Sequence, residues 1–293
     1  MFKRSVGHYR PACNGRCLLL DHTADPSAMN LFHTSFSMIV LPCVLWFVFA
    51  VGALPVWGAF FGSLIVGGLT VSACTCLTLC YVTEPGILHF KEVEETVEGS
   101  ETTYKKFVLL LDGRETALEV KRAKICRQTN TAIENFDHYC PWTGNAVGKR
   151  NYPYFFGFVT STTVLSLAVL AFTIWGIFAT STALGIDVPE YIALGSQSPS
   201  NIVQVMLCVY ASITFLALIG LNGYHCFLVA DNVTTNERLR GTYFGKTNPH
   251  DKGCCGNAQA ILCHPTVESR VKEGEGMTNP LLIEPGQPLV SHA

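Results

Sequence analysis

The chain has few charges for its length of 293 residues, since Asp, Glu, Lys and Arg make up only 14% of it while 49% is hydrophobic. Soluble globular proteins usually carry about 25% charged residues. From Pro26 to Thr83 none of the four occurs, and the stretches 151–186 and 191–230 lack them as well. These gaps indicate a membrane protein, and a soluble bundle of unusually apolar helices is the alternative.

The uncharged stretches predict four membrane-spanning helices. The first stretch has room for two spans of about 20 residues, at about 34–52 and 56–80, with residues 52–55 (Gly-Ala-Leu-Pro) as the turn. The third span follows residue 151, and the fourth runs from about 202 to 228. No cleavable signal peptide is visible, so the first span is expected to remain as an anchor.

The basic residues predict the orientation, because Lys and Arg mark the cytosolic side of a membrane protein. All 20 lie before the first span, between residues 91 and 150, or from residue 238 onward. The short turn after the first span and the loop 180–200 carry none. We therefore expect both termini and the central loop to be cytosolic, in an endomembrane (Golgi or ER) or in the plasma membrane.

Residues 136–142 of the central loop read Phe-Asp-His-Tyr-Cys-Pro-Trp and place Asp137, His138 and Cys140 within four residues. A carboxylate can orient an imidazole, and the imidazole can deprotonate a thiol and so make it a nucleophile. For an isolated set of this kind, a buried polar cluster or part of a metal site is the simpler interpretation.

The stretch resembles the signature of the DHHC protein S-acyltransferases, the palmitoyltransferases, in a variant with tyrosine for the second histidine. Residues 141–152 continue the resemblance apart from Ala146. Residues 84–86 (Glu-Pro-Gly) resemble the family's Asp-Pro-Gly motif after the second span, and residues 234–237 (Thr-Thr-Asn-Glu) its Thr-Thr-x-Glu motif after the fourth. Three separated motifs in this order favour the catalytic interpretation of residues 137–140.

The resemblance implies a protein S-palmitoyltransferase. Cys140 would take an acyl group from palmitoyl-CoA and pass it to a cysteine of a substrate protein, with His138 as base and Asp137 as orienter. The implied substrates are cytosolic or membrane proteins with juxtamembrane cysteines, and no nucleic acid is expected. Exposing a palmitoyl chain to water would cost about 11 kcal/mol, so we expect the chain to lie in a cavity between the spans.

Residues outside the signature are expected to support the site. The resemblance implies this for four that follow the last span: Thr234, Thr235, Glu237 and Asn257. Thr235, rather than Thr234, would hydrogen-bond Asp137 while Glu237 braces the loop, although a helix cap explains the same spacing. Lys149 and Arg150 lie where they could meet the phosphates of coenzyme A, but basic residues at a cytosolic border are equally common for topological reasons.

The central loop has too few cysteines and histidines for zinc. The family's domain normally binds two zinc ions, each through three cysteines and one histidine. The resemblance aligns Cys126 with one ligand, but other residue types stand at five further ligand positions: Ile125, Thr129, Ala132, Tyr139 and Ala146. The other candidates between residues 83 and 151 are His89, His138 and Cys140. We therefore expect no metal and an apolar, hydrogen-bonded core instead; a degenerate site for another metal is the alternative.

The expected fold class is an all-α integral membrane protein with four transmembrane helices and a small cytosolic catalytic domain that contains a β-hairpin. Residues 91–106 are charged and expected to be flexible. Residues 104–111 and 114–120 predict the two strands of the hairpin, with Asp112-Gly113 as its turn, packed beside the catalytic stretch. The expected organisation is an N-terminal cytosolic segment (1–33), spans one and two (34–81), the catalytic domain (82–151), spans three and four with a lumenal loop (152–229), a cytosolic packing element (230–265) and a disordered tail (266–293).

Two other classes of protein remain. A catalytically silent membrane scaffold could have lost the zinc ligands, but it would have no reason to keep Asp137, His138, Cys140 and Thr235. A channel or transporter would be expected to carry polar or charged residues inside its spans, and His225 alone is thin support for that class.

Overall fold

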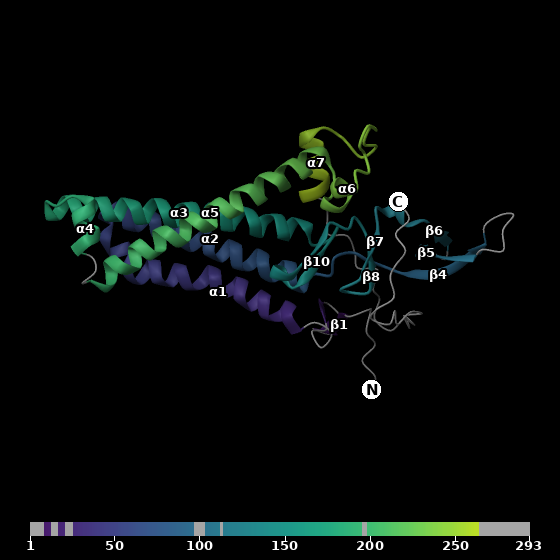
Figure 1. Cartoon of the computed structure of the whole chain (residues 1–293), viewed down its shortest axis with the longest axis horizontal. Coiled ribbons are helices and arrows are strands. Elements are labelled where there is room, and N and C mark those ends of the chain that lie inside the picture. Colours follow the sequence, from purple (N-terminus) through teal and green to yellow (C-terminus); the bar gives the residue numbers. More distant parts are fainter. Residues whose placement is uncertain are drawn as a thin grey trace.

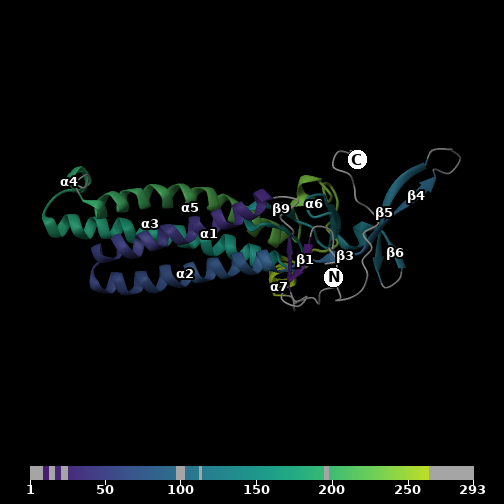
Figure 2. The ribbon, with the colours of Figure 1, turned by 90° about the horizontal axis from the view of Figure 1, so that it is seen from below.

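The structure, a computed structural model, describes residues 9–12, 17–20, 26–96, 103–111, 114–194 and 198–263. Four long helices lie side by side, and a small region of β-strands lies at one end of them (Figures 1 and 2). The helices are α1 (Pro26–Phe49), α2 (Val56–Val82), α3 (Tyr152–Leu184) and α5 (Pro199–Asp231). By length and composition each can cross a membrane. The predicted fold class is thereby confirmed, although the β-region is larger than one hairpin.

The helix ends follow from local sequence. Helix α2 begins after Pro55, and α3 ends at Gly185, whose φ of 70° suits glycine. Helix α5 ends at Asn232, which is also left-handed with φ 50°. Helix α1 begins at Pro26, eight residues before the predicted start at residue 34.

The interior of the helix bundle is apolar, as are many of its outward-facing side chains. Trp46 of α1, Val66 of α2 and Leu165 of α3 belong to one buried cluster, whereas Val48 and Val71 are 65% and 67% exposed. Apolar side chains on both sides of a helix are expected where one side meets lipid. Helix α4 (Val188–Leu194) lies between α3 and α5 at the end away from the strands (Figure 1).

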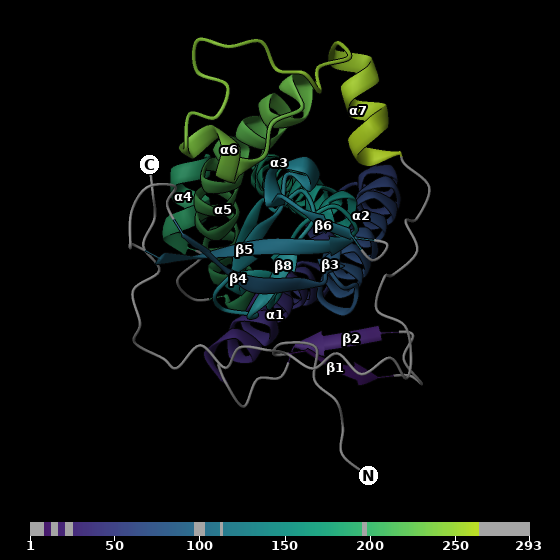
Figure 3. The same cartoon turned by 90° about the vertical axis from the view of Figure 1, so that its right-hand side faces the viewer.

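The strands form four small antiparallel sheets. They are β1 (Tyr9–Ala12) with β2 (Cys17–Leu20); β3 (Ile87–Leu88), β8 (Thr131–Ile133) and β7 (Lys124–Cys126) in that order; β4 (Phe90–Thr96), β5 (Thr103–Leu111) and β6 (Arg114–Thr116); and β9 (His138–Cys140) with β10 (Asn145–Val147). Figure 3 looks onto this end and shows β3 to β6 and β8 across the helix ends, with α6 (Thr235–Leu239) and α7 (Cys254–Leu262) above them.

The predicted hairpin exists, but its position and its surroundings differ from the prediction. Strands β5 and β6 pair from Leu109↔Thr116 to Leu111↔Arg114, and the predicted turn at Asp112 and Gly113 lies outside the described residues. The return strand stops at Thr116, and a 3-10 helix, η3 (Leu118–Lys121), follows. Leu109 packs against Leu88 and Ala132, so the hairpin contacts the β3–β8–β7 sheet rather than the catalytic strand β9. The prediction that it lies beside the catalytic stretch was wrong.

The prediction that residues 91–106 are flexible was wrong for residues 91–96 and 103–106, which lie in strands, whereas residues 97–102 lie outside the described residues. Residues 90–96 form strand β4, which pairs with β5 from Phe90↔Leu109 to Thr96↔Thr103. The rings of Phe90 and Phe107 meet edge-on at 5.8 Å. High charge hid this strand in the sequence, and such composition is compatible with the place of β4 at the edge of the β4–β5–β6 sheet. The expected disordered tail, residues 266–293, lies outside the described residues.

Candidate active site

The strand pair β9–β10 holds the candidate nucleophile at the membrane end of the β-region. Its register places Val147 opposite His138 and Asn145 opposite Cys140. Between the strands, a 3-10 helix, η4 (Pro141–Thr143), leads to Gly144, whose φ is 63°. A Cβ atom at residue 144 would lie 3.1 Å from the Tyr81 ring, so glycine suits this tight turn both in conformation and in space.

The Asp137 carboxylate is buried and fully engaged. Its Oδ2 lies 2.6 Å from Nδ1 of His138 and accepts a hydrogen bond from the Thr235 hydroxyl at 2.8 Å. Its Oδ1 accepts from the Thr235 backbone N–H at 2.7 Å. Burial alone would raise the pKa of Asp137, but the hydrogen bond and charge of His138 outweigh it and lower that pKa. The carboxylate therefore fixes one ring nitrogen of His138 and remains charged.

His138 and Cys140 perturb each other's ionisation. Burial opposes charge on both groups, but the Asp137 and Cys140 hydrogen bonds raise the pKa of His138 to about 10. In the same way, the His138 hydrogen bond and charge overcome burial and lower the pKa of the Cys140 thiol. Each group therefore favours the charged form of the other: the imidazolium favours the thiolate of Cys140, and the thiolate favours the imidazolium of His138.

The surroundings of Cys140 are apolar on the membrane side. The thiol is buried in a cluster with Cys80, Phe155, Val159 and Val229. Phe155 meets the ring of His138 at 5.1 Å and that of His225 at 4.9 Å, both edge-on. A nucleophile at the head of an apolar interior suits an apolar substrate group.

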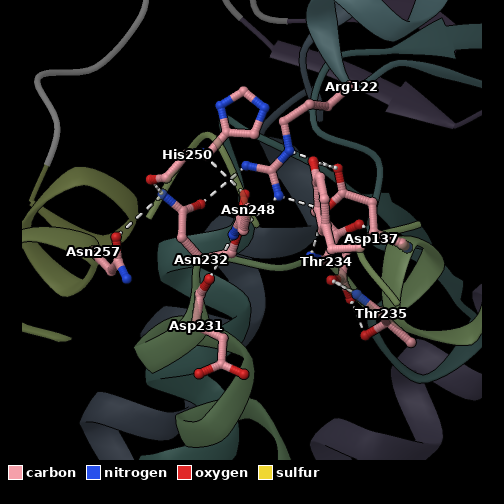
Figure 4. Close-up of polar contacts among 11 residues, drawn as sticks. Arg122, Asp137, Asp231, Asn232, Thr234, Thr235, Asn248, His250 and Asn257 are labelled. Carbon is pink, nitrogen blue, oxygen red and sulfur yellow. Dashed lines mark hydrogen bonds and ion pairs between the residues drawn. The ribbon is translucent and has the colours of Figure 1, made fainter. Parts of the chain in front are cut away.

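The segment after α5 supplies the grip on Asp137 (Figure 4). Thr234 caps helix α6: its hydroxyl accepts from the Glu237 N–H at 3.2 Å, and the Glu237 carboxylate accepts from the Thr234 N–H at 2.9 Å. This capping box and the grip of Thr235 on Asp137 occur together, so the two interpretations of these residues do not exclude each other. Asn257 of α7 donates to the carbonyl oxygen of Ala230 at 2.7 Å and closes the end of α5.

Two hollows lie near the site. A polar cleft of about 330 Å³ runs beside Asp137 and is lined by Lys121, Lys149 and Lys252 among others. An apolar groove of about 510 Å³ lies between α1 and α5, and it begins near His33. Ser35, two residues along α1, donates a hydrogen bond to the Trp142 carbonyl oxygen at 2.8 Å, which brings the groove's upper end close to η4.

Comparison with known proteins matches residues 116–242 to the DHHC palmitoyltransferase family model. These residues therefore resemble a DHHC palmitoyltransferase domain, and they are called the DHHC domain below. Palmitoyltransferase ZDHHC9 of Homo sapiens is 38% identical over 156 residues, which are 50% of this chain and 40% of that protein. Palmitoyltransferase ZDHHC8 of Homo sapiens is 36% identical over 152 residues, 52% of this chain and 18% of that protein. Palmitoyltransferase ZDHHC18 of Mus musculus is 27% identical over 292 residues, covering 90% of this chain and 73% of that protein. The chain thus matches less than half the length of ZDHHC9 and of ZDHHC8.

The residues at the zinc-ligand positions of this DHHC domain do not fit zinc. Ala132 and Ala146 are fully buried and have no donor atom in their side chains. The hydroxyls of Thr129 and Thr131 hydrogen-bond each other at 2.8 Å. Cys126 packs in an apolar cluster, and burial raises the pKa of its thiol. Within the described residues, no group of three or more His, Cys, Asp or Glu side chains could hold a metal ion.

Sequence reasoning missed several residues that hold the DHHC domain in place. Asn145 donates from Nδ2 to the carbonyl oxygens of Cys80, Tyr81 and Thr83 at 3.0 to 3.1 Å and so ties β10 to the end of α2. Arg122 forms an ion pair with Glu237 across 115 residues of sequence. Nothing in the sequence around Asn145 or Arg122 indicates these contacts, because the partners of both residues are distant in the sequence.

Lys149 and Arg150 both face carboxylates. Lys149 Nζ lies 2.8 Å from Glu134 Oε1, and Arg150 forms an ion pair with Glu84. Oε2 of Glu84 accepts from the N–H groups of Gly86 and Ile87 at 2.7 and 2.8 Å. The Glu-Pro-Gly motif is thereby joined to the start of α3. Lys149 lines the polar cleft as well.

Proposed function

We propose that this chain is a protein S-palmitoyltransferase in which Cys140 carries the acyl group. The observation that carries this proposal is the contact series from Thr235 through Asp137 and His138 to a buried Cys140 thiol of lowered pKa. A thiolate is the nucleophilic form of cysteine, and both steps of the reaction exchange one thioester for another. Little driving force is then required beyond a positioned nucleophile.

In the first step, the Cys140 thiolate attacks the thioester carbonyl carbon of acyl-CoA. A bond forms between that carbon and Sγ, the bond to the coenzyme A sulfur breaks, and the departing sulfur takes the proton held by His138. In the second step, the neutral His138 accepts the proton of a substrate thiol, and the resulting thiolate displaces Cys140 from the acyl group. Asp137 keeps the imidazole in one orientation through both steps.

The two hollows suit the two parts of the acyl donor: the apolar groove suits the acyl chain, and the polar cleft suits coenzyme A. We assign the acyl chain to the apolar groove between α1 and α5, lined by Met38, Leu41, Leu45, Val203, Met206 and Leu207. Burial of the chain there avoids the cost of about 0.8 kcal/mol per methylene in water. We assign the phosphates of coenzyme A to the polar cleft, where Lys149 is the proposed contact. Arg150 does not line this cleft, and its pairing with Glu84 favours a structural role.

The four spans make the chain a multi-pass membrane protein. We propose that the β-region and both termini are cytosolic, since all the basic residues of the sequence lie on that side of the spans. Palmitoyl-CoA and juxtamembrane cysteines of cytosolic or membrane proteins would then reach Cys140 from the cytosol.

Palmitoyl-CoA with a labelled acyl chain tests the proposal on detergent-purified protein. We expect hydroxylamine-sensitive label on the natural chain, and none on Cys140→Ser, because a thioester needs the sulfur. Cys126→Ser, which changes the other buried cysteine of the β-region, is the matched control and should keep the label. Label on neither the natural chain nor this control would contradict the proposal and favour a silent scaffold.

We also propose that the DHHC domain folds without zinc. We expect less than about one zinc per chain by elemental analysis, and unchanged thermal stability after treatment with a chelator, since structural zinc normally supplies folding free energy. A stoichiometric metal content, or a large loss of stability on chelation, would show that a degenerate site survives.

A further inference from the structure

Arg122 contacts both segments that surround Asp137, the residue proposed to orient His138. Its backbone carbonyl oxygen accepts a hydrogen bond from the N–H of Phe136, the residue before Asp137, at 3.3 Å. Its side chain extends the other way and reaches the segment after α5, which holds Asp137 from the opposite side (Figure 4). Lys124 of β7 reaches the same segment and donates from Nζ to Asn236 Oδ1 at 3.0 Å.

The guanidinium of Arg122 is saturated with acceptors. Nε donates to Glu237 Oε1 at 2.7 Å, and Nη2 forms an ion pair with Glu237 Oε2. Nη1 donates to Oδ1 of Asn232 and Nη2 to its carbonyl oxygen, each at 3.0 Å. The side chains of Arg122 and Glu237 are each only 9% exposed. A planar, bidentate set of this kind is specific to arginine, because an ammonium group cannot satisfy it.

The backbone of Arg122 indicates that the position is imposed by these contacts. Its φ is 49°, in the left-handed region that non-glycine residues adopt at a cost. Asn232, its partner, is also left-handed with φ 50°. Asn232 donates in turn to the His250 carbonyl oxygen at 2.9 Å, so the C-terminal element joins the same network.

We propose that Arg122 is a positioning residue for the acyl transfer: by holding Glu237 and Asn232, it fixes helix α6 so that Thr235 grips Asp137. It thereby joins the β-region to the end of α5 in a domain where Ala132 and Ala146, which have no donor atom in their side chains, stand at zinc-ligand positions. The inference rests on the proposed role of Asp137. Arg122 also lines the polar cleft, but its positioning role requires no contact with substrate.

The rate at which iodoacetamide alkylates Cys140 tests this positioning role. It is measured by mass spectrometry on the purified full chain at a series of pH values from 5 to 10. Arg122→Lys keeps the positive charge but loses the bidentate guanidinium contact with Glu237. We expect it to slow alkylation at pH 7 by roughly 2- to 30-fold, the range found for residues that act through a network, and to move the rise in rate to higher pH. Arg127→Gln changes an exposed arginine in the turn after β7 and should leave the profile unchanged.

A double-mutant comparison distinguishes a positioning role that acts through Thr235 from a general contribution to stability. If Arg122 acts through Thr235, Arg122→Lys in a Thr235→Ala background should slow alkylation less than it does alone. Additive effects would overturn the proposal. So would a variant with lowered thermal stability whose pH profile coincides with that of Arg127→Gln.

Two features keep the test decisive. If Arg122→Lys does not fold, Glu237→Gln weakens the same contact from the other side and must shift the profile in the same direction. Alkylation needs no acyl-CoA, so a failure of the proposed palmitoyl transfer would leave this measurement valid and would be seen separately, as absence of acyl label.

Discussion

Replacing His138 with alanine is expected to slow acylation of Cys140 at pH 7 by about 10²- to 10⁴-fold, the usual contribution of a positioned acid or base. The imidazolium is what lowers the pKa of the Cys140 thiol against the effect of burial. Without it burial dominates, the pKa rises above its ordinary value, and the thiol is neutral at pH 7. Single-turnover labelling with radioactive palmitoyl-CoA measures the change.

The natural chain and His138→Ala should also differ in how the alkylation rate of Cys140 changes with pH. In the natural chain the thiolate persists below the ordinary thiol pKa, and His138 stays protonated up to a pH of about 10. Alkylation of Cys140 should therefore be nearly constant through neutral pH and fall only on the acid side. In His138→Ala the rate should instead increase with pH through the alkaline range. A flat profile in the variant would contradict the thiolate–imidazolium pair.

The second large effect is on stability. Replacing Glu84 with alanine is expected to destabilise the protein by about 3–5 kcal/mol, the range for loss of one partner of a buried ion pair. Glu84 is 4% exposed, and its carboxylate serves both Arg150 and two backbone N–H groups. Thermal unfolding in detergent, followed by intrinsic fluorescence, measures the loss.

The matched control for Glu84→Ala is Glu190→Ala, which removes an exposed carboxylate of α4. Its effect should stay within about 0.5 kcal/mol, as for most surface substitutions. If both variants unfold at the same temperature, the Glu-Pro-Gly motif does not hold the start of α3 through charge.

The sequence was most informative where the residues that define a feature are contiguous in the chain. The spans could be predicted because an uncharged stretch of membrane length needs no knowledge of its partners. Asp137, His138 and Cys140 lie within four residues, so the contact of Asp137 with His138 is local, but the catalytic interpretation of the three also needed the family resemblance. Thr235 lies 98 residues from Asp137, and only the family resemblance connected the two.

What the sequence concealed depends on long-range pairing. Strand β4 carries many charges and gains its structure from β5, so composition predicted a flexible segment there. Arg122 meets residues 110 and 115 positions away, and no local pattern marks an arginine that faces inward. The same holds for Glu84 and Arg150, which are 66 residues apart.

The grip of Thr235 on Asp137 has a consequence for biosynthesis. Ribosomes make Cys140 and His138 long before they make residue 235, and the last membrane helix must insert before that residue can reach the carboxylate. Until then Asp137 lacks both of its hydrogen bonds from Thr235, and the imidazole it orients is correspondingly less constrained. If Cys140 is the nucleophile, it reaches the membrane incompletely activated, and the segment that follows α5 completes the proposed site.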